Sequence, residues 1–224
     1  MKKLTLALVI LFNAFVAAGQ VKVSILGDSY STFKDWIPEA NETWYGAITG
    51  NDVQRVEDTW WYRLIDDNGL KLEKNNSWSG TTICNTGYRS EDYSDKSFLA
   101  RSADLGDSPD IIYVFGGTND AWAKSPIGEY GGTDMFAVRP AMAAMLDNIK
   151  STYPEAVTVV IVNTELTKDV EESIVTICEE KGVPYVMLSA IDKQRGHPSI
   201  SGMNAISRQV WKTTAPLLYA KLKK

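Results

Sequence analysis

Two uninterrupted runs of β-branched and aromatic residues constrain the fold of this 224-residue chain more than any other feature. They are Ile-Ile-Tyr-Val-Phe at residues 111–115 and Val-Thr-Val-Val-Ile-Val at residues 157–162. A strand that is apolar on both faces is typical of a parallel sheet covered by helices on both sides. Shorter runs at residues 21–26, 70–73 and 185–188 complete a predicted set of five strands.

Helical patterns fill the gaps between the predicted strands. Residues 139–153 carry apolar side chains at the spacing of one helix face, namely Met142, Met145, Leu146 and Ile149. Residues 169–180 form a second predicted helix, and a third runs from about residue 203 toward the C-terminus. Strands that alternate with helices predict a three-layer α/β/α sandwich around a parallel sheet. No repeat, linker or low-complexity tract interrupts residues 20–224, so we expect one domain there.

The first 19 residues have the features of an export signal. Lys2 and Lys3 provide a positive start, residues 4–18 are almost entirely apolar, and Ala17-Ala18-Gly19 resembles a cleavage site. The apolar run is shorter than the ~20 residues that a membrane span requires, and no cysteine follows the cut to carry a lipid anchor. We therefore expect cleavage near Gly19 and a periplasmic or extracellular protein.

The charge of the mature chain excludes several classes of partner. Removing Lys2 and Lys3 from 23 basic residues leaves 21 against 28 acidic residues, a net charge of about −7. An acidic protein without a basic cluster repels nucleic acid and anionic membranes. The expected partner is a small molecule or a neutral polymer such as a glycan.

The supply of metal ligands and nucleotide-binding motifs is equally restrictive. The chain has one histidine, His197, and two cysteines, which is too few for a structural zinc site. No Gly-x-Gly-x-x-Gly or Walker loop follows a predicted strand, so we expect neither metal nor cofactor. Export would permit a disulfide, but nothing in the sequence brings Cys84 and Cys178 together. Two unpaired thiols are the favoured prediction, one in a polar loop and one buried in a helix.

Four positions, three of them polar, stand where an α/β sheet places its functional groups, just past the ends of strands. Ser29 lies in Gly-Asp-Ser after the first strand, and Gly80 follows the second. Asn119 lies in Gly-Gly-Thr-Asn-Asp after the third, and His197 in Gly-His-Pro follows the last. Taken singly, these residues are also ordinary helix caps, turn formers or an exposed histidine. Their joint order along the chain favours a shared site.

These four blocks resemble the SGNH hydrolase superfamily, the GDSL-type esterases and lipases, over residues 21–210. The resemblance implies a flavodoxin-like sheet, a serine esterase activity and an acyl-enzyme intermediate. It implies that Ser29 is the nucleophile and His197 the general base. The backbone N–H groups of Ser29 and Gly80 and the side-chain amide of Asn119 would then form the oxyanion hole.

The sequence departs from the family pattern behind the histidine. The family commonly has an aspartate three residues before the histidine, and Gln194 occupies that position. Asp192 is the nearest upstream acid, so we name it as a tentative third catalytic residue. Three ways of orienting His197 stay open: Asp192, Gln194, or a backbone carbonyl in a Ser-His dyad. Asp192 could equally be a loop cap.

Seven tryptophans and ten tyrosines bear on the substrate. Trp60 and Trp61, at the head of a predicted helix, are expected in the core, whereas Trp44 and Trp122, in predicted loops, are candidates for substrate contact. Aromatic faces near a site suit sugar rings, and no long apolar lid is evident. We therefore expect an esterase that deacetylates a carbohydrate. A lysophospholipase or thioesterase, and a weakly active or non-catalytic glycan-binding module, are the alternatives.

Overall fold

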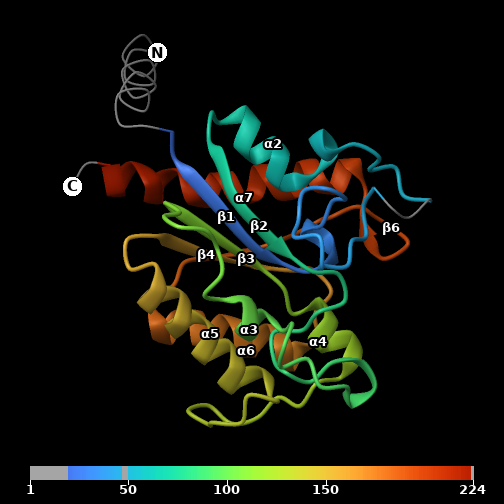
Figure 1. Cartoon of the computed structure of the whole chain (residues 1–224), viewed down its shortest axis with the longest axis vertical. Coiled ribbons are helices and arrows are strands. Elements are labelled where there is room, and N and C mark those ends of the chain that lie inside the picture. The colour runs from blue at the N-terminus through green and yellow to red at the C-terminus, as the bar shows by residue number, and fades with distance from the viewer. Residues whose placement is uncertain (1–19, 47–49, 223–224) are drawn as a thin grey trace.

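The computed structural model describes residues 20–46 and 50–222 and is built on one parallel sheet. Five strands lie in the order β2-β1-β3-β4-β5 (Figure 1). They are β1 Lys22–Gly27, β2 Lys71–Ser77, β3 Ile111–Phe115, β4 Val157–Val162 and β5 Tyr185–Met187. This order is that of a flavodoxin-like sheet, which confirms the predicted fold class. The predicted export signal lies outside the described residues.

Helices cover both faces of this sheet (Figure 1). The helices α2 (Trp60–Asp67) and α7 (Ile200–Leu222) lie on one face. On the other face lie α3 (Phe98–Arg101), α5 (Val138–Thr152) and α6 (Lys168–Lys181). The short helix α4 (Thr118–Ala123) directly follows the turn after β3. Three 3-10 turns, η1 (Ser29–Ser31), η2 (Val56–Asp58) and η3 (Tyr88–Ser90), complete the connections.

The alternation of side chains along each strand divides the core in two. In β3, the side chains of Ile111, Tyr113 and Phe115 enter the cluster beneath α2 and α7. Ile112 and Val114, from the same strand, enter the cluster beneath α3, α5 and α6. Successive residues point to opposite faces, so an uninterrupted apolar run supplies both layers. Trp60 and Trp61 are buried in the first cluster, as predicted.

The second strand is longer than its apolar pattern predicts. It continues past residue 73 through Asn75, Asn76 and Ser77, which are polar but buried. Their polar atoms are satisfied internally: Asn75 donates to Ser31 O at 2.9 Å, and Ser77 Oγ donates to Asn75 Oδ1 at 2.6 Å. Hydrogen bonds therefore replace apolar character in this half of β2. The extension aligns Ser77 with Gly27 and brings Gly80 beside the turn that follows β1.

A small hairpin carries the histidine and was not expected from the sequence. Its strands are β6 (Lys193–Gln194) and β7 (His197–Pro198), paired antiparallel. The two turn residues, Arg195 and Gly196, have φ values of 54° and 77°. Positive φ at both positions is the signature of a tight hairpin turn that matches the twist of the strands.

The two cysteines are unpaired, as predicted. Cys178 lies on α6 and is buried. Cys84 is also fully buried, which corrects the picture of a thiol in an open polar loop. Its backbone N–H donates to the carboxylate of Asp120, so the loop is folded inward against α4.

Candidate active site

Three of the four predicted site residues follow neighbouring strands. Ser29 comes after β1, Gly80 after β2 and Asn119 after β3, and β1 lies between the other two. The strand order reverses at β1, and α/β sheets place their ligand sites at the carboxyl ends of the strands at such a point. Figure 1 shows this edge of the sheet at the right, close to the hairpin of β6.

The turn that presents Ser29 is fixed by its neighbours. Asp28 caps η1 by accepting a hydrogen bond from the backbone N–H of Tyr30 at 3.0 Å. A Cβ on Gly27 would lie 2.5 Å from Ser77 Oγ and 2.6 Å from Ser31 Cβ, so only glycine fits there. Ser29 itself is 4% exposed. The turn therefore holds the serine hydroxyl in one place at the edge of the sheet.

The hydroxyl of Ser29 meets the imidazole of His197. Ser29 Oγ and His197 Nε2 are 2.9 Å apart, although 168 positions separate the residues in sequence. The other ring nitrogen, Nδ1, lies 3.3 Å from the carbonyl oxygen of Arg195. A carbonyl can only accept a hydrogen bond, so Nδ1 carries the proton and Nε2 presents its lone pair to Ser29. This is the arrangement of a nucleophile and a general base.

Asp192 does not occupy the position that the tentative prediction gave it. Its carboxylate accepts a hydrogen bond from Ser199 Oγ, and its carbonyl oxygen accepts one from Ser199 N–H at 3.0 Å. Gln194 does not orient the imidazole either, because its Oε1 accepts from Asp52 N–H at 2.9 Å. The turn residue Arg195 supplies the acceptor instead. Of the three possibilities left open by the sequence, the geometry selects the backbone carbonyl.

The predicted oxyanion donors differ in how their hydrogen-bonding capacity is used. Among described residues, no hydrogen bond is formed by the backbone N–H of Ser29 or Gly80. Asn119 Nδ2 donates to Thr81 O at 2.9 Å, which places this amide beside Gly80. Gly80 has a φ of 79°, and no atom lies within 4 Å of the position a Cβ would take. The N–H groups of Ser29 and Gly80 are thus available to a ligand, and the Asn119 amide lies on the loop that carries Gly80.

Tyr88 is a site residue that sequence reasoning missed. Its hydroxyl donates to Asn119 Oδ1 at 2.7 Å, which fixes the amide so that its nitrogen faces the Gly80 loop. The backbone that follows Tyr88 is unusual, since Arg89 and Ser90 have φ values of 56° and 60°. Nothing in the spacing of Tyr88 along the chain pairs it with Asn119.

Arg101 is a second residue that the sequence did not reveal. Its guanidinium is buried and donates to Gly27 O at 3.4 Å, to Asn76 O and to Thr81 Oγ1 at 2.8 Å. It therefore ties together the ends of β1 and β2 and the loop that carries Gly80. Burial lowers the pKa of Arg101 to about 9, and the nearby Asp28 carboxylate opposes this shift.

Two buried carboxyl groups lie at the same edge of the sheet. Burial raises the pKa of Asp28 to about 7, against the lowering effect of the hydrogen bond from Tyr30 N–H. Burial likewise raises the pKa of Asp120 to about 6, and hydrogen bonds from Ile83 and Cys84 N–H oppose it. The carboxylate of Asp120 holds the loop after Gly80, so its contacts are structural.

Aromatic rings surround the imidazole. Trp44 stacks flat on His197, with ring centroids 3.6 Å apart and planes at 6°. Trp122 meets the same ring edge-on at 6.3 Å and is 44% exposed. Trp122 lies on α4 and not in the loop expected for it. Both predicted substrate contacts are therefore beside His197, but only Trp122 has a largely exposed ring.

The surroundings of His197 favour its neutral form. The side chain is buried, and this burial lowers its pKa to about 4. The hydrogen bond to Arg195 O raises the pKa, and the ammonium group of Lys193 lowers it. A neutral imidazole at neutral pH is ready to accept a proton from Ser29.

Among the described residues there is neither a metal-binding cluster of side chains nor a membrane-spanning helix. Residues 20–46 and 50–222 hold no group of three or more His, Cys, Asp or Glu side chains arranged to bind a metal ion. None of the helices within these ranges combines the length and apolar character needed to span a bilayer.

Comparison with known proteins identifies the family. The model of the GDSL-like lipase/acylhydrolase family matches residues 21–214. The chain belongs to the GDSL-like lipase/acylhydrolase family. It is accordingly an acyl hydrolase of the SGNH superfamily, as the four motif blocks indicated. No match was found among curated proteins.

Solved structures extend this comparison. A protein described as a GDSL-like lipase from Bacteroides uniformis ATCC 8492 is 50% identical, with a TM-score of 0.87 over 90% of this chain and 99% of that one. A family 3 carbohydrate esterase from Clostridium thermocellum is 17% identical, with a TM-score of 0.59 over 90% and 98%. A family two carbohydrate esterase from the same organism, in complex with cellohexaose, is 14% identical, with a TM-score of 0.61 over 89% and 65%. The two esterases share the fold of this GDSL-like hydrolase.

Proposed function

We propose that this chain is an exported serine esterase that removes acetyl or similarly short acyl groups from a carbohydrate. The observation that carries the proposal is the 2.9 Å contact between Ser29 Oγ and His197 Nε2. A hydroxyl, a neutral base and a cluster of donors are the parts that acyl transfer requires.

The geometry supports a two-step mechanism. Ser29 Oγ attacks the ester carbonyl carbon while its proton passes to His197 Nε2. The carbonyl oxygen, now negative, is bound by Asn119 Nδ2 and the N–H groups of Ser29 and Gly80. His197 then returns the proton to the leaving alcohol as the C–O bond breaks, which gives an acyl-enzyme. A water molecule, deprotonated by His197, releases the acid and restores Ser29.

The pair Ser29 and His197, without an acid behind the histidine, affects how well the charged imidazolium is stabilised. When Nε2 takes the proton, Nδ1–H still donates to Arg195 O, so the ring keeps its tautomer and its direction. A carbonyl dipole stabilises the positive ring less than a carboxylate would. The mechanism therefore depends on the rings and dipoles around His197 more than that of a Ser-His-Asp triad.

The exposed ring of Trp122 beside His197 supports a carbohydrate as the substrate. Trp122 presents a 44% exposed indole within 6.3 Å of the imidazole ring centre, and a flat apolar ring suits the face of a sugar. The family two esterase that shares this fold was solved with cellohexaose. The net charge of −5 over the full chain favours a neutral polymer over an anionic surface.

The central test is hydrolysis of p-nitrophenyl esters of increasing chain length. We expect acetate to be cleaved faster than butyrate or octanoate, and Ser29→Ala to abolish the activity. A fluorophosphonate should label Ser29 and no other serine, and Ser94→Ala, which alters an exposed serine, should behave as wild type. Full activity in Ser29→Ala would remove the assigned nucleophile. A preference for octanoate would favour a lysophospholipase or thioesterase.

The carbohydrate has its own test. Trp122→Ala should raise the KM for an acetylated xylo-oligosaccharide. It should leave the kinetics with p-nitrophenyl acetate unchanged, because only the glycan is long enough to contact the Trp122 indole. Equal effects on both substrates would argue against a sugar platform. Glycan binding without labelling of Ser29 would instead indicate a non-catalytic binding module.

Export is inferred from the sequence of residues 1–19, and the predicted cleavage site lies just before the first strand. Strand β1 starts at Lys22, and Gln20 lies on the surface with its side chain donating to Gly69 O at 3.1 Å and Leu70 O at 2.8 Å. Cleavage after Gly19 would leave this strand whole. N-terminal sequencing of protein secreted by the native host should find Gln20 first, and a mature chain that retains Lys2 and Lys3 would contradict export.

A further inference from the structure

The closest ring contact in the site is the stack of Trp44 on His197. Centroids 3.6 Å apart and planes at 6° place the indole directly over one face of the imidazole. Tyr30 and Trp122 approach the same ring edge-on, at 5.1 Å and 63° and at 6.3 Å and 66°. The face of Trp44 that covers His197 cannot also hold a sugar ring. Its contact is with the base of the enzyme.

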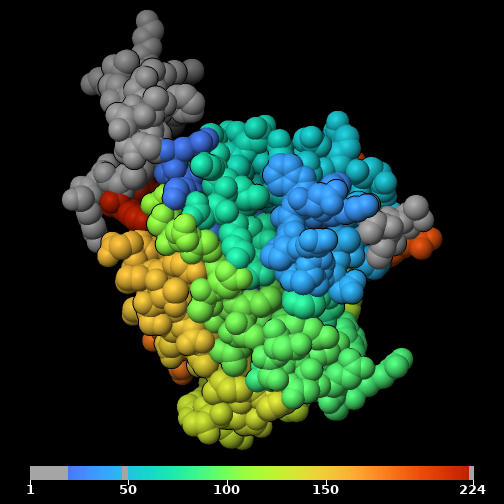
Figure 2. Space-filling model, in the orientation of Figure 1, coloured from blue at the N-terminus to red at the C-terminus, as the bar shows by residue number. Residues whose placement is uncertain are grey.

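The position of Trp44 is determined by the nucleophile turn. Trp44 N–H donates to Thr32 Oγ1 at 2.9 Å, and the Thr32 hydroxyl donates to Ser29 O at 3.0 Å. The next residue, Tyr45, donates through its hydroxyl to Pro198 O at 2.8 Å. The Trp44–Tyr45 segment is therefore linked through Thr32 to Ser29 and bonded directly to β7, the strand that carries His197. The light-blue surface in Figure 2 belongs to the longer stretch of chain between η1 and residue 46, in which Trp44 lies.

Apart from Trp44, the rings around His197 (Tyr30, Tyr45 and Trp122) meet the imidazole edge-on, and no acidic side chain among the described residues accepts from its Nδ1. Nδ1 has one acceptor, Arg195 O, at the long distance of 3.3 Å. Asp192 and Gln194 are bonded elsewhere, so no side chain has taken the place of the missing acid. A turn of the ring about its Cβ–Cγ bond would break its 2.9 Å contact with Ser29 Oγ. A flat neighbour at 3.6 Å blocks that rotation.

We propose that Trp44 is a positioning residue that replaces the third member of the triad by stacking. The indole holds the plane of His197 so that Nε2 stays on Ser29 Oγ, and it offers a π face to the imidazolium that forms during acyl transfer. This inference rests on the proposed function of the Ser29–His197 pair. It assigns to an aromatic ring the orienting work that a carboxylate does elsewhere.

The kinetic test uses three replacements of Trp44 and one control. Trp44→Ala should lower kcat for p-nitrophenyl acetate by about a hundredfold, the cost of a misplaced catalytic group, with little change in KM. Trp44→Phe should recover most of the loss because phenyl is flat, whereas Trp44→Leu should not. Trp36→Ala, in the same segment but packed on Trp61 and Tyr62, should behave as wild type.

Two kinetic outcomes would overturn the inference. If Trp44→Ala raises KM and leaves kcat unchanged, Trp44 is a wall of the substrate site. If Trp44→Leu is as active as Trp44→Phe, bulk is sufficient and stacking is not required. Thermal unfolding of each variant checks that the fold is retained.

The single histidine permits a second readout that needs no substrate. Protein labelled with ¹⁵N-histidine has one imidazole, so its two nitrogen shifts report the tautomer and pKa of His197 directly. The wild type should show Nδ1 protonated and a pKa well below 6.5. In Trp44→Ala, water reaches the ring, so the pKa should rise and the second tautomer should appear. The other titratable groups near the ring, Lys193, Tyr30 and Tyr45, are unchanged in this variant.

The two readouts separate the possible failures. An unchanged tautomer and pKa in Trp44→Ala would overturn the role of Trp44 even if the esterase assignment holds. Conversely, if the wild type hydrolyses no ester, the proposed function fails, and the NMR comparison still decides whether Trp44 orients His197.

Discussion

At the scale of the single residue, we expect the ionisation of His197 to set the acid limit of activity. The imidazole must be neutral to accept the Ser29 proton, and burial lowers its pKa from 6.5 to about 4. The base is therefore available above about pH 4 and is lost as the pH falls through that value. We expect the acid limb of kcat/KM for p-nitrophenyl acetate near pH 4. A limb near pH 6.5 would show that the ring is open to water.

A second residue-scale prediction concerns Tyr88. Tyr88→Phe removes the hydroxyl that fixes the Asn119 amide, so kcat should fall by about tenfold, the effect of one hydrogen bond, with KM unchanged. Asn119→Ala, which removes the oxyanion donor itself, should cost about 3–4 kcal/mol of transition-state stabilisation. An unaltered kcat in Tyr88→Phe would mean that Thr81 O alone holds the amide.

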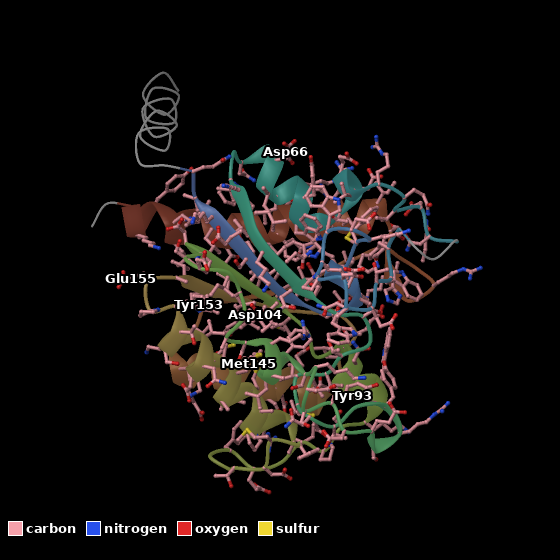
Figure 3. The ribbon with its side chains drawn as sticks, viewed as in Figure 1. Asp66, Tyr93, Asp104, Met145, Tyr153 and Glu155 are labelled. Carbon is pink, nitrogen blue, oxygen red and sulfur yellow. The ribbon has the colours of Figure 1, made fainter. Side chains whose placement is uncertain are left out.

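Tyr153→Phe is the matched control for this prediction. Its hydroxyl donates to Ala103 O at 3.0 Å and accepts from Leu105 N–H at 2.7 Å. Figure 3 shows Tyr153 at the left of the molecule and Tyr93 at the right. Loss of this hydroxyl should lower the melting temperature without changing kcat, which separates a stabilising hydrogen bond from a positioning one.

At the scale of the element, the β6–β7 hairpin gives His197 a backbone acceptor, so we expect the enzyme to need no acid to orient the base. The Arg195–Gly196 turn directs a backbone carbonyl at Nδ1, a task that any residue with the right φ can perform. Asp192 instead joins the base of this hairpin to α7. Its carboxylate accepts from Ser199 Oγ, which in turn accepts from Gly202 N–H at 3.2 Å in the first turn of the helix.

This role of Asp192 leads to a sharp prediction. Asp192→Asn keeps an acceptor for Ser199, so kcat/KM should stay within about threefold of wild type, less than one hydrogen bond is worth. In a serine-protease triad the same change costs about ten-thousand-fold. Asp192→Ala removes the acceptor and should lower stability by about 1 kcal/mol, measured by chemical denaturation. A thousandfold or greater loss in Asp192→Asn, with stability intact, would restore it as the third catalytic residue, because only chemistry gives so large an effect.

The strand ends and the β6–β7 hairpin differ in how much of the candidate site the sequence predicts. Ser29, Gly80 and Asn119 could be predicted because each follows a strand, and parallel strands bring their ends together. The partner of His197 could not, since it depends on the φ of Arg195, and a positive φ at arginine is rare. Arg101 and Tyr88 were missed for a similar reason. Their contacts are made across loops whose conformations have no periodic signal.

At the scale of the whole molecule, the sheet separates two cores, and both cysteines lie in the same one. Cys84 and Cys178 belong to the cluster beneath α3, α5 and α6, on the face away from α2 and α7. The apolar runs at residues 111–115 and 157–162 predicted this layering, because strands buried on both faces need helices on both sides. The polar half of β2 could not be predicted from hydropathy, since internal hydrogen bonds stabilise it.

The last prediction uses these thiols to measure how the core opens. Both are fully buried, and burial raises the pKa of each to about 12, so the reactive thiolate is scarce at neutral pH. Ellman's reagent should modify neither thiol in the native protein and both in guanidinium chloride, and reductant should not change the melting temperature. Cys84 lies in the loop after Gly80, whereas Cys178 lies on α6. The Cys178→Ser variant leaves Cys84 as the single thiol. If Cys84 then reacts no faster than the protein unfolds globally, the loop that carries Gly80 opens only together with the core. The proposed oxyanion hole is then preorganised. Fast labelling of Cys84 alone would mean that this loop opens on its own.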